Sequence, residues 1–217
     1  INQQGTQVDL ALINGALELS DQAALKLGDD IRRVSGIDSP NSVAQLKQWL
    51  SDQLGKDIDK LGKEAVNELL EAPQVKANPA VYYVLKKRKE MAKSSVKKYT
   101  AMENAVCKDG RVRGLLQFYG ANRTGRWAGR LVQVQNLPRN YIPELSLARN
   151  LVKQENAAML ELTYGSLPDT ISQLIRTAFV PGEGCHFCVA DFSAIEARVL
   201  AWMAGEQWRL EVFRISC

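Results

Sequence analysis

Apolar positions recur at helical spacing through the first hundred residues. Between residues 8 and 35 an apolar side chain stands at about every third or fourth position, which predicts a long amphipathic helix. Ser42 and Gln45 form a capping-box pattern that predicts a second helix ending at Gly55. Further helices are expected over 63–70 and over 79–106, the latter opened by the Asn78-Pro79 pair.

The second half of the chain mixes short strands with helices. Asp109-Gly110 predicts a tight turn. The expected strands are 115–119, 131–134, 178–180 and 186–192, and the expected helices are 147–164, 169–176 and 194–204, the last with Ile195, Val199, Trp202 and Met203 facing inward. The first two strands flank a loop rich in Arg and Gly. The pattern predicts an α+β, mostly helical fold with a small sheet.

Composition narrows the class of protein. The 217 residues are 46% hydrophobic and 24% charged, which is typical of a globular chain rather than a disordered one. No apolar run reaches the ~18–20 residues of a membrane span, and no signal peptide is visible, so we expect no association with a membrane. Four Cys do not suggest a disulfide framework, which favours the cytoplasm. Cys185-x-x-Cys188 lacks a second ligand pair, so we interpret it as incidental.

Positive charge is concentrated in one segment. Residues 76–139 carry a net charge of +12, whereas residues 1–75 carry −5 and residues 140–217 carry −3. Such a segment is the electrostatic footprint expected for a polyanion. A solvated helix face is the alternative for the lysines near 86–98. It does not account for the six Arg between 111 and 139, which lie in a Gly-rich stretch that we expect to be non-helical. Charge alone therefore favours nucleic acid.

A carboxylate lies at the end of the strand expected over 186–192. Asp191 stands at its end, and Glu196 comes one helical turn into the next helix. The carboxyl end of a strand is where ligands collect, and Mg²⁺ prefers one or two carboxylates together with substrate phosphates. The alternative is that Asp191 only caps the helix, since Asp is common at that position. The residues alone leave both interpretations open.

The stretch from Gly120 to Arg139 is a second candidate. Glycines let a backbone approach a ligand closely, and Arg offers planar donors for phosphate. Gln and Asn can donate to minor-groove acceptors shared by all base pairs, which reads duplex shape rather than sequence. A Gly-rich turn with solvated arginines is the alternative. Because arginines and amides alternate here, we favour a binding role.

These two motifs resemble those of the family A DNA polymerases, in their phage-type form. The run 191–198 (DFSAIEAR) is similar to the first catalytic motif of the family. Residues 124–131 together with 135–139 resemble its primer–template contact segment, and 93–99 resembles the thumb helix that grips duplex DNA. The resemblance implies a thumb-like helical subdomain over 1–110 and a partial palm with an antiparallel sheet over 111–217.

The resemblance also implies residue roles. Asp191 would ligate both catalytic Mg²⁺ ions and Phe192 would add its backbone carbonyl to one. Ser193, Ile195 and Glu196 would line the incoming deoxynucleoside triphosphate. The implied contacts to primer–template duplex DNA are Lys93, Ser94, Ser95, Lys97, Lys98, Asn122, Arg126, Arg130, Gln135, Asn136 and Arg139. Whether Arg126 or Arg130 carries the family's arginine role stays open.

The implied activity is DNA-dependent addition of deoxynucleotides to a primer 3′ end by two-metal nucleotidyl transfer. The second catalytic Asp, expected in a His-Asp-Glu segment, is absent, as is the helix that binds the triphosphate. We therefore expect a polymerase fragment from a bacterial or phage-infected cell that binds duplex DNA, is inactive alone, and forms a homodimer through its truncated palm. The alternatives are a non-catalytic nucleic-acid-binding module and an interaction domain whose basic helix docks an acidic protein.

Overall fold

The structure is a computed structural model that describes residues 2–91 and 96–215. The chain divides into two compact units, one ending at Val180 and the other beginning at Pro181, and each is described by itself. Most residues are helical and the two small sheets are antiparallel, which confirms the predicted α+β, mostly helical class.

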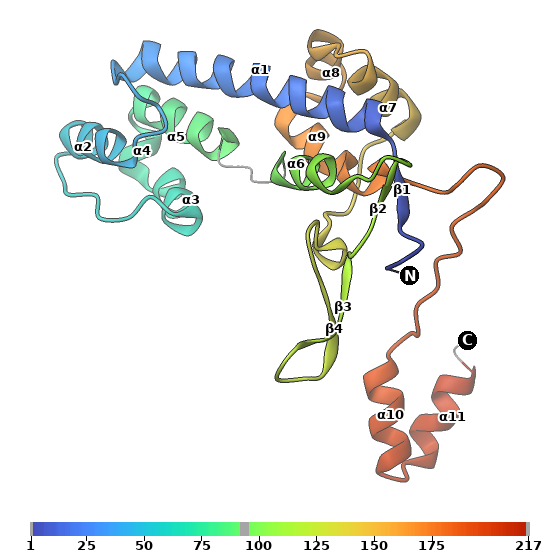
Figure 1. Ribbon diagram of the computed structural model, residues 1–217. Helices are drawn as coiled ribbons and strands as arrows, with labels where there is room; N and C mark the ends of the chain where they lie inside the picture. The colour runs from blue at the N-terminus through green and yellow to red at the C-terminus, as the bar shows by residue number, and fades with distance from the viewer. Residues whose placement is uncertain (1, 92–95, 216–217) are drawn as a thin grey trace. The chain divides into compact units, whose positions relative to one another are not determined.

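The first unit is organised by helix α1 (Leu10–Ser35), as Figure 1 shows. Asp9 begins the helix by accepting a hydrogen bond from the Leu12 N–H at 3.2 Å, and Gly36 ends it with a left-handed φ of 71°. At ~1.5 Å per residue it is about 39 Å long. The predicted first helix is therefore confirmed, and its length lets one element contribute to two hydrophobic cores.

One core lies at the C-terminal end of α1. It is closed by α2 (Val43–Leu54), α3 (Lys63–Glu71), the short α4 (Pro73–Lys76) and α5 (Pro79–Met91). The predicted caps are confirmed, because Ser42 Oγ accepts from the Gln45 N–H and Asn78 Oδ1 accepts from the Val81 N–H. Its buried side chains are Ile31, Leu46, Leu50, Ile58, Val66, Leu70, Val75, Val81, Val84 and Leu85.

The other core surrounds the N-terminal half of α1. Helix α6 (Val96–Ala105) enters it through Tyr99, which is fully buried and donates its hydroxyl to Ile171 O at 2.9 Å. Burial raises the pKa of this phenol. We predicted one continuous helix over 79–106. The structure describes α5 and α6 within that range, and the residues that would join them, 92–95, lie outside the described part of the chain.

Three helical segments complete this core. They are α7 (Leu145–Lys153), α8 (Ala157–Tyr164) and α9 (Leu167–Leu174), and the 3-10 turn η2 (Ile175–Ala178) follows. A single helix over 147–164 was expected, and this prediction is wrong. Glu155 takes a left-handed φ of 54°, and Asn156 caps a new helix by accepting from the Met159 N–H at 3.1 Å.

A three-stranded antiparallel sheet ties distant parts of the first unit together. Its order is β2 (Arg111–Val112), β1 (Thr6–Val8), β5 (Phe179–Val180), so β1 lies between segments that are far from it in the sequence. β5 confirms the strand expected near 178–180. At the end of β1, Asp9 forms ion pairs of 2.6 Å with Arg149 and Lys153 of α7. These pairs fix the start of α1 against α7.

The second unit is a pair of helices, α10 (Ile195–Met203) and α11 (Gln207–Ile215). Arg198 joins them, because its guanidinium lies 4.6 Å from the centre of the Phe213 ring and donates to Phe213 O at 3.2 Å. The strand expected over 186–192 is not formed. No strand of the described chain pairs with this segment, and an extended backbone needs such a partner for its hydrogen bonds.

The division into thumb and palm at residue 110 stays a prediction. The core around the N-terminal half of α1 draws on both sides of that boundary, with Tyr99 and Met102 before it and Val112 and Val132 after it. Within the described residues, no helix has the length and apolar character needed to cross a membrane.

Candidate nucleic-acid interface

A β-hairpin and the segment that follows it contain six of the eleven residues predicted to contact DNA. It consists of β3 (Leu116–Ala121) and β4 (Arg126–Gly129), joined by a turn in which the Gly125 N–H donates to Ala121 O at 2.9 Å. The first predicted strand is confirmed with shifted ends, but the strand expected over 131–134 is wrong. Because the turn is short, the pairing partner of β3 is the Arg- and Gly-rich segment itself.

The predicted 135–139 segment lies directly beside this hairpin. It begins within the 3-10 turn η1 (Val134–Asn136). The side chain of Gln135 covers Gly129, where even a Cβ would overlap the amide. Arg176 holds the segment from the other side by donating to Leu137 O at 2.9 Å. Two pieces of sequence that were predicted to act together are thus in contact.

Six of the predicted DNA contacts are exposed in this region. Asn122 lies in the hairpin turn, Arg126 is the first residue of β4, and Arg130 directly follows its last residue. The structure therefore brings both candidate arginines to the surface and does not choose between them. The exposed residues are Asn122, Arg126, Arg130, Gln135, Asn136 and Arg139.

The two predicted lysines of α6 differ in their surroundings. Lys97 is exposed. Lys98 is half-buried, and its ammonium donates to Val132 O at 2.8 Å, just beyond the hairpin. Burial lowers the pKa of Lys98. Lys98 thus has a structural role that the sequence did not indicate. The other predicted contacts of this helix, Lys93, Ser94 and Ser95, lie outside the described residues.

Two arginines of the basic segment hold the N-terminal residues in place. Arg111 Nη1 donates to Gly5 O at 3.4 Å, and Arg113 Nε donates to Gln3 O at 2.8 Å. Arg113 also forms a two-pronged pair with Asp109, at 2.9 and 2.6 Å. This guanidinium lowers the pKa of Asp109 to about 2. The net charge of the segment therefore overstates its capacity for an external polyanion.

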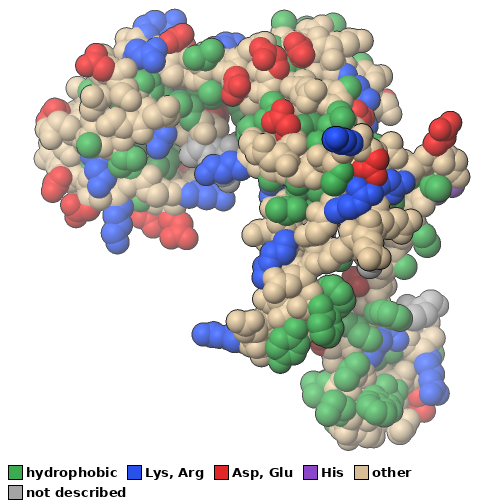
Figure 2. Space-filling model, viewed as in Figure 1, with side chains coloured by type: hydrophobic (Ala, Val, Ile, Leu, Met, Phe, Trp, Pro, Cys, Tyr) green, Lys and Arg blue, Asp and Glu red, His purple; other side chains and the backbone are tan. Residues whose placement is uncertain are grey.

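Sequence reasoning missed three exposed aromatic side chains on the hairpin. Phe118 is 71% exposed, Tyr119 58% and Trp127 59%. Phe118 and Trp127 face each other across the two strands, with ring centres 5.2 Å apart and an edge-to-face angle of 69°. Figure 2 shows hydrophobic side chains gathered on this hairpin. Their position inside an arginine-rich segment without acidic residues was the signal available in the sequence.

The residues expected to bind metal and nucleotide lie in the second unit. Asp191, Phe192 and Ser193 are exposed and precede α10, and Ile195 and Glu196 form its first turn. No side chain accepts a hydrogen bond from the start of α10, and its N-cap position is Ala194. Asp191 therefore does not cap this helix.

The described residues do not form a complete metal centre. Nowhere among residues 2–91 and 96–215 do three or more His, Cys, Asp or Glu side chains gather at a distance that could hold an ion. An exposed carboxylate such as Asp191 can supply one oxygen ligand to Mg²⁺, which usually takes few protein ligands and completes its shell with water and phosphate. The fit to magnesium is thus partial.

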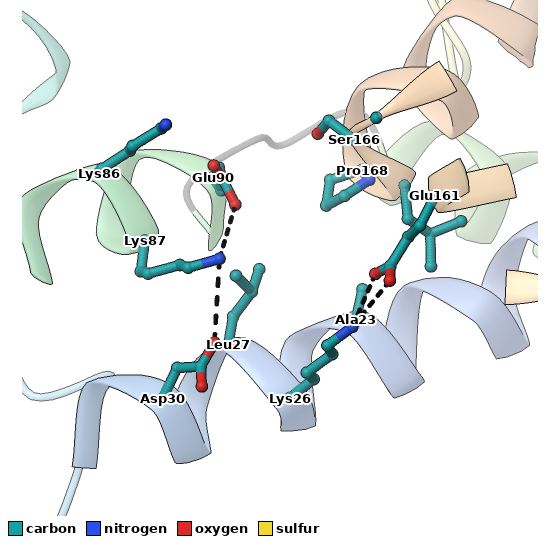
Figure 3. A pocket seen from close by; sticks show the side chains of 12 residues that line it. Ala23, Lys26, Leu27, Asp30, Lys86, Lys87, Glu90, Glu161, Ser166 and Pro168 are labelled. Carbon is teal, nitrogen blue, oxygen red and sulfur yellow. Dashed lines mark hydrogen bonds and ion pairs between the residues drawn. The ribbon is translucent and has the colours of Figure 1, made fainter. Parts of the chain in front are cut away.

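A pocket elsewhere in the first unit has a different character. Its volume is about 330 Å³ and it lies between α1, α5 and α8. Figure 3 shows Lys26 turned to Glu161, at 2.8 Å, and Lys87 turned to Asp30 and Glu90, at 3.8 and 3.7 Å. Because these ammonium groups already face carboxylates, the pocket is a poor site for phosphate.

Comparison with known proteins identifies the family. Residues 16–216 match the model of DNA polymerase family A, and the chain belongs to this family. It is 54% identical to a DNA polymerase of Bacillus phage SP02, over 98% of this chain and 32% of that protein. It is 26% identical to the thermostable DNA polymerase I of Thermus thermophilus, over 97% of this chain and 22% of that protein. No solved structure matches. The chain thus spans a third or less of the curated relatives it matches.

Proposed function

We propose that this chain supplies the duplex-gripping part of a DNA-dependent DNA polymerase. The observation that carries the proposal is the acid-free stretch 110–143, which contains six Arg and no Asp or Glu. Four of these arginines are exposed on or next to the hairpin, and Lys97 is exposed on α6. Arginines of this kind bind phosphates, while Gln135 and Asn136 offer donors to a minor groove.

Salt dependence tests this proposal directly. Five exposed cations that each neutralise one phosphate give a slope of log K against log salt of about −4.5. The measurement is fluorescence anisotropy of a labelled blunt DNA duplex titrated with the 217-residue chain at several salt concentrations. A flat response would overturn duplex binding and leave a protein-docking role.

Matched charge variants make the test local. Arg130→Gln removes one cation from the interface, so the slope should become less steep by about one unit. Lys56→Gln removes the same charge from an exposed position outside the basic segment and should leave the slope unchanged. Equal effects of the two variants would mean that only net charge, and not this surface, attracts DNA.

In the whole polymerase, we propose that the chain contributes to nucleotidyl transfer from deoxynucleoside triphosphates to a primer 3′ end. Asp191 would hold magnesium by its carboxylate and Phe192 by its backbone carbonyl, while Ser193, Ile195 and Glu196 would line the nucleotide. Two bound Mg²⁺ ions would supply activation of the 3′-hydroxyl and stabilisation of the leaving pyrophosphate. The exposure of Asp191 and its absence from the cap of α10 support this role.

The isolated chain should be inactive. One exposed carboxylate without a surrounding cluster does not hold two divalent ions in place. Primer extension by the 217-residue chain with Mg²⁺ and deoxynucleotides tests this, and robust extension would refute it. In the complete polymerase, Asp191→Asn should lower the extension rate by more than the roughly 10²–10³-fold typical of one lost electrostatic group, with DNA affinity retained.

A second copy of this chain is our proposed partner for the second unit. Ile195, Val199, Trp202 and Met203 were expected to face inward, yet they are 45%, 44%, 72% and 74% exposed. Burying one such side chain is worth about 1.5–3 kcal/mol, and a two-fold dimer is a common solution. Sedimentation equilibrium at micromolar concentration should show a dimer, and a 24 kDa monomer would exclude it.

A further inference from the structure

The β3–β4 hairpin carries an aromatic surface that duplex binding does not explain. Phosphates are met by arginine and minor-groove edges by amides, and neither needs an exposed aromatic ring. Phe118, Tyr119 and Trp127 nevertheless keep more than half of their surface open to solvent. Large aromatic side chains usually bury most of their area, so three exposed rings on one short hairpin point to a ligand.

The rings are held in place by the hairpin itself. The backbone pairs Leu116–Gly129 and Gln117–Ala128 bring β3 and β4 into register, and the Phe118–Trp127 contact continues this row. The strand then bulges, and Tyr119 takes a left-handed φ of 52°. A Cβ on Gly125 would lie 2.8 Å from the Tyr119 ring, so the turn packs closely against it. A fixed ring loses little entropy when a flat ligand stacks on it.

The charge around the rings selects the ligand. The nearest charged residues along the chain are Arg123, Arg126 and Arg130, and no acidic residue occurs between Asp109 and Glu144. The ligand must therefore combine flat aromatic groups with negative charge. Unpaired nucleotides have this chemistry, because each offers a base face and a phosphate. The bases of an intact duplex are stacked on one another and do not offer their faces.

We propose that Phe118 and Trp127 form a stacking platform for unpaired bases of single-stranded DNA next to the duplex held by the same hairpin. The inference rests on the proposed function, since it assumes that DNA approaches this surface. It goes beyond that function by assigning a second kind of ligand, the single strand, to the aromatic side of the hairpin.

Fluorescence anisotropy with two DNA probes separates single-strand stacking from duplex binding. The 217-residue chain is titrated into labelled oligo(dT) and into a blunt duplex at the same salt concentration. Phe118→Leu/Trp127→Leu keeps apolar side chains but removes both ring faces. It should weaken oligo(dT) binding by about 10-fold or more, because stacking is worth roughly 1–3 kcal/mol per base, and change duplex binding less than about 3-fold.

Two controls guard against a misfolded hairpin. Phe118→Tyr/Trp127→Tyr keeps ring faces at both positions and should hold oligo(dT) affinity within about 3-fold of the original. Trp208→Leu removes an equally exposed ring from α11 and should have no effect on either probe. Oligo(dT) should also quench the intrinsic fluorescence of the unmodified chain, and Trp127→Phe should abolish that quenching.

Each remaining outcome overturns the inference in a distinguishable way. If the leucine variant weakens both probes equally, or neither, while salt-dependent duplex binding persists, the platform is wrong and the proposed function stands. If the unmodified chain binds neither probe, both fail together. Quenching that survives in Trp127→Phe would place the single strand elsewhere on the chain.

Discussion

Gly129→Ala isolates the role of the Gln135 amide, because it displaces the amide and leaves every charged residue unchanged. Gly129 is buried at the end of β4, under the side chain of Gln135. A Cβ there would lie 2.6 Å from Gln135 Cδ and 2.7 Å from its Nε2. The Oε1 of the same amide would lie closer still, whereas carbon atoms in contact are separated by about 3.5–4.0 Å, so the amide must retreat by more than about 1 Å. The backbone need not move, because the obstacle is the far end of a flexible side chain.

The expected cost to stability is small. Replacing Gly by Ala within a strand gains roughly 0.5–1 kcal/mol, and moving an exposed Gln side chain off its preferred rotamer costs roughly 0.5–1.5 kcal/mol. The free energy of unfolding should therefore change by less than about 1 kcal/mol. If the Gln135 amide donates to DNA, losing that hydrogen bond costs about 0.5–1.5 kcal/mol, which weakens duplex binding about 2- to 12-fold.

A double-mutant cycle decides whether the effect passes through the amide. Duplex affinity is measured by anisotropy for the unmodified chain, Gly129→Ala, Gln135→Ala and the double variant, with thermal melting of each. Once Gln135 is truncated, Gly129→Ala should have no further effect on affinity. An unchanged loss in the Gln135→Ala background would refute the reasoning, because the methyl would then be disturbing the hairpin itself.

The remaining predictions concern anchoring contacts. Lys98→Met should lower the free energy of unfolding in urea denaturation by about 1–2 kcal/mol, because it removes a charged hydrogen bond. Lys97→Met should leave that free energy within about 0.5 kcal/mol and make the salt slope of duplex binding about one unit less steep. The reverse pattern would mean that Lys97 anchors the fold and Lys98 contacts DNA. Gly15→Ala should destabilise by about 1–3 kcal/mol despite the better helix propensity of Ala, because its methyl would overlap a backbone carbonyl of α7, and an unchanged melting curve would contradict this close packing. The Asp109 carboxyl should titrate near pH 2 by NMR, and its pKa should return toward the ordinary value of 3.8 in Arg113→Gln. Because folding lowers this pKa, the contribution of Asp109 to stability is present above pH 3.8 and is lost as the pH falls toward 2.

Local signals in the sequence predicted the helices well. The caps at Ser42 and Asn78 depend on side chains within three residues, and the pattern from 8 to 35 needs only one buried face. The break between α7 and α8 was missed, because Asn156 stands inside an otherwise helical pattern and acts as a cap only once Glu155 adopts a left-handed conformation.

Strands were predicted less well because a strand depends on its partner. The apolar run 186–192 has the composition of a strand, but within the described residues no neighbour pairs with it. Conversely, β4 contains one Gly and one Arg among its four residues and follows a Gly-containing turn, so its sequence resembles a loop, yet it pairs with β3 because a short turn returns it there. The candidate site residues could be identified from the sequence. Their grouping around the hairpin could not, because it depends on the pairing of β3 with β4.

The same limitation applies to charge. A net charge of +12 over residues 76–139 treats every cation alike, and twelve phosphate contacts would give a salt slope near −11. The structure shows that these cations differ. Lys98 donates to a backbone carbonyl, and Arg111 donates to the backbone near the N-terminus. Arg113 donates to a backbone carbonyl and also forms an ion pair with Asp109. The exposed cations on the hairpin and beside it are Lys97, Arg123, Arg126, Arg130 and Arg139. A slope near −4.5 rather than −11 is therefore expected from the cations exposed around the hairpin, and not from the number that the whole segment contains.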